Sequence, residues 1–125
     1  MVTSAYTNIG LLLLRLGFGG MMLTHGIPKL LKLLSGDFSF GNPIGIGAAP
    51  TLVLAVIGEV VFPILVIVGF KTRLSAIPII ITMAVAAFIV HATDPIGTKE
   101  MALLYMFAFI AIALLGPGKF AIDRK

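Results

Sequence analysis

The sequence predicts an all-α fold, a four-transmembrane-helix bundle that runs up-down-up-down through a bilayer. Of the 125 residues, 59% are apolar and only 11% are charged, whereas soluble domains usually contain about a quarter charged residues. The mean hydropathy is +1.15. The apolar residues gather in four runs, each near the roughly 20 residues that a helix needs to cross the hydrocarbon core. At this length, residues 1–125 are expected to form a single transmembrane domain.

The first apolar run covers residues 8–34 and carries more charge than the others. Arg15, His25 and Lys29 interrupt it, and Pro28 is expected to kink the helix because proline removes one backbone hydrogen bond. The Gly/Pro-rich residues 35–50 that follow are expected to form an external loop.

The second and third runs cover residues 51–69 and 74–91, and a short basic turn separates them. A connection this short predicts that the two helices are antiparallel neighbours. Pro63 lies inside the second run and is expected to bend it. Pro78 is expected in the opening turn of the third helix, where its missing N–H matters least.

The fourth run covers residues 100–115 and ends at a Gly-Pro-Gly sequence. Four crossings place both termini on one side of the membrane. Five Lys and Arg residues lie on that side and three on the other: Lys71, Arg73, Lys119, Arg124 and Lys125 against Lys29, Lys32 and Lys99. The positive-inside rule therefore predicts that both termini face the cytoplasm, with the chain as a multi-pass protein of the inner (cytoplasmic) membrane.

Composition also narrows the chemistry. The chain has no cysteine, which removes disulfides, thiolate zinc sites and cysteine-ligated iron–sulfur clusters. Its net charge of +4 is scattered between apolar runs, so membrane lipid rather than nucleic acid is the expected partner. The opening ten residues contain no Lys or Arg, so the first run is expected to remain in the protein rather than to be cleaved as a signal peptide.

Two charges fall inside the predicted helices, where each costs at least about 2.5 kcal/mol at the bilayer centre. Counted at about 1.5 Å per residue, Arg15 lies roughly 10 Å and Glu59 roughly 15 Å from the same membrane face. This matched depth predicts a structural ion pair between Arg15 and Glu59. The same two residues could instead line a polar pocket for a quinone head group, an anion or a proton path.

A second polar group lies toward the opposite face, where His25, Lys29, His91 and Glu100 reach similar depths. With Arg15 and Glu59 as the floor, these four would form the rim of one ligand-binding pocket. His25 and His91 are the candidate catalytic groups because an imidazole titrates near neutral pH. The alternative is that all four are helix-end residues that reach the head groups and have no function in binding.

Helical geometry refines this pocket. At about 100° per residue, Arg15, Met22, His25 and Lys29 share one face of the first helix, which is expected to point inward. Tyr105 lies about 140° round its helix from Glu100 and is expected to pack elsewhere. Two histidines at matched depth would suit a haem or a metal, but paired ligands on one helix are missing, so no metal site is predicted.

Three segments together resemble the DoxX family of small four-helix membrane proteins: LLLLRLGFGGMMLTHGIPKL, GEVVFPILVIVGFKTRLSA and EMALLYMFAFIAIALLGPGKFAID. The matching positions are Arg15, His25, Gly26, Lys29, Glu59, Arg73, His91, Glu100, Gly116, Gly118 and Asp123. The chain has Ala-Ile-Asp at residues 121–123, where the family commonly has a Ser-Leu-Asp-like sequence.

The resemblance implies a function in membrane redox chemistry. The family takes its name from a membrane subunit of a thiosulfate:quinone oxidoreductase, and other members are linked to membrane oxidoreductase complexes. The resemblance therefore implies a quinone-interacting subunit, with quinone as a possible cofactor and a protein partner or a homo-oligomer. Two alternatives stay open: a non-catalytic assembly or anchoring subunit, and an oligomeric carrier of a small solute.

Overall fold

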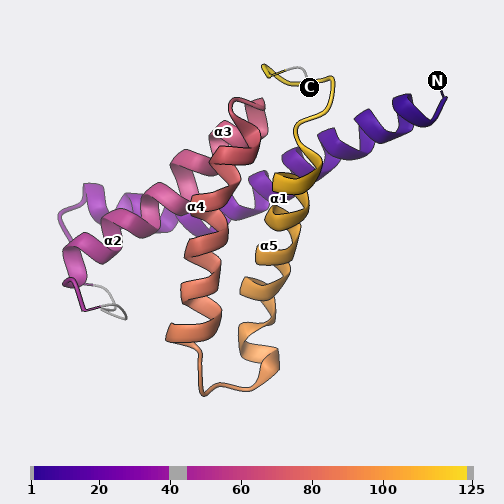
Figure 1. The fold of residues 1–125 in the computed structure, drawn as a ribbon. Helices are drawn as coiled ribbons and strands as arrows, with labels where there is room; N and C mark the ends of the chain where they lie inside the picture. Colours follow the sequence, from indigo (N-terminus) through magenta and orange to yellow (C-terminus); the bar gives the residue numbers. More distant parts are fainter. Residues whose placement is uncertain (1, 40–44, 124–125) are drawn as a thin grey trace.

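The computed structural model describes residues 2–39 and 45–123, and these form helices and connections without a strand. Four helices are long and apolar enough to cross a membrane, which confirms the predicted fold class of a multi-pass membrane protein. Their segments, in chain order, are α1 (Val2–Leu34), α2 (Ala48–Val56), η1 (Ile57–Val61), α3 (Phe62–Val68), α4 (Thr72–Val85), η2 (Ala86–Val90) and α5 (Ile96–Leu115). Segments α2, η1 and α3 form one continuous helix, and α4 continues into η2 (Figure 1).

The helices begin earlier than expected. The first starts at Val2 rather than at residue 8, and α5 starts at Ile96 rather than at residue 100. Pro95 stands immediately before α5 as its N-cap residue, a boundary where its missing N–H breaks no helical hydrogen bond. Of the predicted loop at residues 35–50, residues 40–44 lie outside the described part of the chain, as do Arg124 and Lys125 of the charge count.

The prolines fall at informative places. Pro63 is the second residue of α3, which directly follows η1, a five-residue π-helical segment. Proline cannot donate a hydrogen bond to the preceding turn. The helix accommodates the missing bond with the wider π turn of η1, at the place where the sequence predicted a bend. Pro28 lies within the unbroken α1. Pro78 lies well inside α4, not in its opening turn, because α4 already begins at Thr72.

The helices form two antiparallel pairs. One pair is α1 with the α2–η1–α3 helix, and the other is α4 with α5. The pairs meet around the α3–α4 turn and diverge toward the other end, where the α4–α5 connection lies far from the α1–α2 end (Figure 1). Apolar side chains fill the region where the pairs meet: Met22, Val66, Ala76, Ile79, Met83, Tyr105, Met106, Phe109 and Ile112.

The outer faces of the helices expose many large apolar side chains, such as Leu13, Ile81 and Phe107. Lipid therefore contacts these faces in the membrane. The four crossings place both ends of the described chain on one side of the membrane. That this side is the cytoplasm remains a prediction from the distribution of Lys and Arg.

Residues 116–123 fold back across the α3–α4 turn, and we call them the C-terminal strap. The Asp123 amide donates to the Gly69 carbonyl at 2.9 Å, and the Asp123 carboxylate accepts hydrogen bonds from the amides of Lys71 and Thr72, both at 2.8 Å. Asp123 thus caps the start of α4 from a distant part of the chain. A side chain on Gly69 would meet the Ala121 methyl at 2.2 Å, so the strap also requires glycine at that turn.

Candidate functional site

Arg15 lies at the strap and is only 1% exposed. Its guanidinium donates to the Ile67 carbonyl at 2.7 Å, more weakly to the Val66 carbonyl at 3.4 Å, and also to the Phe120 carbonyl. The carbonyls of the last helical turn have no partner within the helix. Arg15 supplies one, and it joins α1 both to the end of α3 and to the C-terminal strap.

The predicted ion pair between Arg15 and Glu59 is therefore wrong. The partner of Glu59 is Lys29, whose ammonium lies 2.6 Å and 2.7 Å from the two carboxylate oxygens. The reason is the packing register. A side chain on Gly26 would lie 2.3 Å from the Glu59 carbonyl oxygen, so this glycine stands opposite Glu59. Arg15 stands opposite residues 66–67, about eight residues or roughly 12 Å further along the helix.

The Lys29–Glu59 pair lies at the edge of the core. The Glu59 side chain is 4% exposed and the Lys29 side chain 32% exposed. Glu59 sits in the π-helical segment η1, and single-turn π segments occur frequently at functional sites. Because an uncompensated charge at membrane depth is costly, the pair keeps this position electrically neutral.

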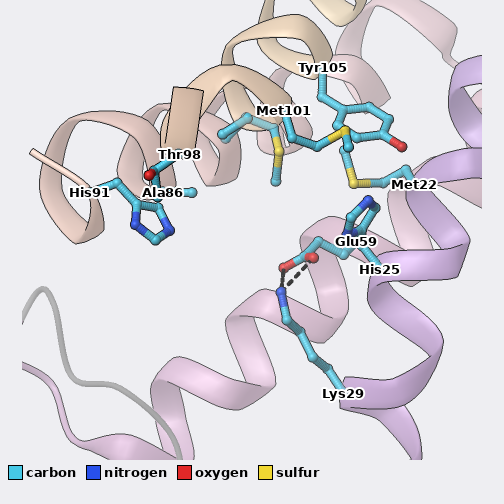
Figure 2. A pocket seen from close by; sticks show the side chains of 11 residues that line it. Met22, His25, Lys29, Glu59, Ala86, His91, Thr98, Met101 and Tyr105 are labelled. Atoms are coloured by element: carbon cyan, nitrogen blue, oxygen red, sulfur yellow. Dashed lines mark hydrogen bonds and ion pairs between the residues drawn. The ribbon is translucent and has the colours of Figure 1, made fainter. Parts of the chain in front are cut away.

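A cavity of about 170 Å³ lies beside this ion pair, where the two helix pairs diverge. We call it the polar cavity (Figure 2). Four of the predicted pocket residues line it, and the remainder of the lining is mostly apolar: His25, Lys29, Glu59 and His91 with Met22, Met83, Ala86, Thr98, Met101, Ala102 and Tyr105. All four membrane-crossing helices contribute to this lining.

Two of the predicted pocket residues lie elsewhere. Arg15 belongs to the strap, as described above. Glu100 is exposed and does not line the polar cavity. The face of α5 that lines it carries Thr98, Met101 and Tyr105 instead. Helical spacing correctly separated Tyr105 from Glu100, but the wrong one of the two was assigned to the pocket, because spacing alone does not show which face of α5 packs against α4 and α1.

Tyr105 is thus a site residue that the sequence reasoning missed. It is 5% exposed, and its ring meets the His25 ring edge-on, with centroids 5.4 Å apart. Its hydroxyl makes no hydrogen bond to any residue that the structure describes. The signal that could have found it is the spacing of residues 98, 101, 102 and 105, which marks a single helix face.

His25 and His91 lie at different parts of the polar cavity (Figure 2). His91 ends η2, and its Nδ1 lies 2.7 Å from a carboxylate oxygen of Asp94. His25 lies beside Met22 and the Lys29–Glu59 pair instead. Each imidazole therefore has its own surroundings, and the two do not form a ligand pair. Across the described residues, no three His, Cys, Asp or Glu side chains gather in a way that could hold a metal ion.

Most of the positions that match the DoxX family lie either at the C-terminal strap or at the polar cavity. Five lie at the C-terminal strap or the turn beneath it: Arg15, Arg73, Gly116, Gly118 and Asp123. Another five lie at the polar cavity: His25, Gly26, Lys29, Glu59 and His91. Glu100 lies at neither.

Comparison with known proteins gives two matches. A family model described as DoxX matches residues 10–92. A protein of Haemophilus influenzae, described as "Uncharacterized protein", is 34% identical over 129 residues, which cover 96% of this chain and 92% of that protein. No solved structure matches the chain.

Proposed function

The chain belongs to the DoxX family, and from this premise we propose that it is a quinone-interacting subunit of a membrane redox system in the cytoplasmic membrane. The observation that carries the proposal is the polar cavity. It brings an ion pair, two imidazoles and a phenol together between apolar helix faces. Small-molecule sites combine these features: mostly apolar walls with a few convergent polar groups.

The size of the polar cavity suits a single-ring head group. Sites for drug-sized ligands measure about 300–1,000 Å³, whereas this cavity measures about 170 Å³. A quinone ring would occupy the cavity, and its isoprenoid tail would lie in the surrounding lipid. Met22, Met83 and Met101 supply flexible apolar walls against the ring.

The polar residues have distinct roles in this proposal. The Tyr105 hydroxyl and the His25 imidazole donate hydrogen bonds to a quinone carbonyl. His25 and His91 are the groups that supply protons, because reduction of a quinone to a quinol consumes two protons with two electrons and an imidazole can act as a general acid and base. The neutral Lys29–Glu59 pair forms the polar floor. Electrons enter from a partner redox subunit, since the chain has no cysteine to hold an iron–sulfur cluster.

The anchoring alternative has support at the other end of the molecule. Arg15 and Asp123 bind backbone groups and hold α1, α3 and α4 together. A subunit that only anchors a partner needs this strap and no ligand. It predicts that nothing occupies the polar cavity. The two functions therefore differ in whether the purified protein retains a bound quinone.

Quinone retention tests the proposal. The protein is purified in mild detergent, and quinones that copurify are measured by mass spectrometry. Tyr105→Phe removes only the hydroxyl that would bind the ring, and Tyr6→Phe makes the same change at a residue that is 71% exposed, away from the cavity. We expect a clear loss of retained quinone in Tyr105→Phe and native retention in Tyr6→Phe. Equal retention in both variants, or no quinone in the native protein, would contradict the proposal.

A further inference from the structure

We propose that the polar cavity also binds a soft monovalent metal ion, copper(I), through the thioether sulfurs of Met22, Met83 and Met101 and the imidazole of His25. This goes beyond the quinone function and does not depend on it, and because both ligands would use His25 and the same cavity, the ion would bind in place of a quinone ring. The proposal rests on how the methionines are distributed. The chain has six, and three of them line this one cavity from three different helices, α1, α4 and α5.

These side chains face a common space. Met22, Met101 and His25 all line this cavity (Figure 2). Met22 and Met83 are buried, with exposed fractions of 0% and 6%, and Met101 is 53% exposed. Methionine is unbranched with three rotatable bonds, so its sulfur can move to a ligand without a shift of the backbone.

The chemistry of these donors selects the ion. Thioether sulfur is a soft ligand that favours copper(I), and imidazole also binds copper, whereas magnesium and calcium prefer oxygen ligands. Zinc is held by thiolate, imidazole and carboxylate, and no three such side chains gather in the described parts of the chain. Soft neutral donors are therefore the metal ligands that this cavity offers.

Charge favours a monovalent ion as well. The thioethers and a neutral imidazole carry no charge, and the charges of Lys29 and Glu59 cancel each other. An added ion would thus bring its full charge to membrane depth, where charge is costly. A single positive charge is less costly there than the double charge of zinc or copper(II).

The chain supplies matched controls for a test. Met21 precedes Met22 and is 58% exposed, and Met106 follows Tyr105 in the apolar core; neither lines the polar cavity. Leucine has nearly the volume of methionine, so Met-to-Leu changes are well tolerated in cores. The test variant is Met22→Leu with Met101→Leu, and the control variant is Met21→Leu with Met106→Leu.

The experiment titrates the full chain in detergent, stripped of metal, with silver(I) as a redox-stable probe. It then repeats the titration with copper(I) against a chromogenic chelator. We expect one ion per chain, an affinity about tenfold or more lower in the test variant, and native affinity in the control variant. X-ray absorption of the copper(I)-loaded protein should show sulfur neighbours, although the chain contains no cysteine.

Equal affinities in the two variants, or a copper shell of nitrogen and oxygen alone, would overturn the metal site. Quinone retention is measured separately on metal-free protein, so the two proposals can fail independently. Silver binding that depends on Met22 and Met101 in a protein that retains no quinone would leave the metal site standing. If the protein retains quinone but its silver(I) affinity is the same without Met22 and Met101, only the metal site would be disproved.

Discussion

The C-terminal strap and the polar cavity both contain buried charged side chains, but these side chains bind different kinds of partner. At the C-terminal strap, Arg15 and Asp123 bind backbone groups of helix ends and turns. At the polar cavity, Lys29 and Glu59 bind each other, and the phenol and imidazoles beside them face open space. Charge inside a membrane helix is thus no sign of function by itself. What distinguishes the two ends is what the charged groups bind: backbone groups at the strap, and each other, beside a cavity, at the other end.

Among the substitutions at the two ends, we expect the largest loss in the free energy of unfolding at the C-terminal strap. Arg15→Met would leave the carbonyls of Ile67 and Phe120 without their donor, in a buried place. A buried acceptor that loses its donor costs about 1–3 kcal/mol, so the loss at two carbonyls is expected to reach about 2–6 kcal/mol. Unfolding by denaturant in detergent micelles measures the loss. Arg73→Met, at an exposed arginine near the same turn, should cost much less, and equal losses would show that Arg15 has no special role.

The Lys29–Glu59 pair should give the next largest effect. Glu59→Gln removes the charge that neutralises Lys29 in a buried place, so we expect a loss of about 2–4 kcal/mol. The double variant Glu59→Gln with Lys29→Met should recover most of it, because it removes both charges. Glu100→Gln is the matched control at an exposed site, with an expected change within about 0.5 kcal/mol. Strictly additive losses in the double variant would argue against the pair.

The cap that the strap places on α4 should contribute less. Asp123→Asn keeps the size of the side chain but weakens its hydrogen bonds to the amides of Lys71 and Thr72. Loss of a helix N-cap typically costs about 1 kcal/mol. The same unfolding assay measures it, with Glu100→Gln at an exposed carboxylate as the control. A control that loses as much would show that the loss at Asp123 is not a capping effect.

The smallest stability effect is expected at Tyr105. Its hydroxyl has no hydrogen-bond partner among the described residues, so Tyr105→Phe should change the free energy of unfolding by less than about 0.5 kcal/mol. The same variant should lose quinone. Together, the two results would separate a residue kept for binding from one kept for folding. A large loss of stability would instead assign Tyr105 to the structure, as with Arg15.

The sequence was sufficient for the fold class because the bilayer itself imposes the pattern. Runs of apolar residues must be helices there, and the short turn at residues 69–71 leaves only an antiparallel pair. The residues of the polar cavity were also largely predictable. His25, Lys29, Glu59 and His91 all line it, since they share a helix face or a depth.

The partners of the charges were not predictable in the same way. Depth along a helix can be counted, but the register between two helices depends on contacts such as that of Gly26 with the Glu59 carbonyl. The partners of Arg15 include the C-terminal strap, which has no helical periodicity to reveal its position. Glu100 and Tyr105 were exchanged because the packing of α5 against α4 and α1 decides which of its faces turns inward, and helical spacing alone does not.

The strap also bears on how the protein is made. A ribosome synthesises residues 116–123 only after all four helices, so the start of α4 has no Asp123 cap while the helices enter the membrane. Arg15 likewise waits for the Phe120 carbonyl from the earliest stage of synthesis. During insertion, the first helix therefore carries a guanidinium whose full set of partners does not yet exist. The bundle is locked by a segment that is synthesised after all four helices.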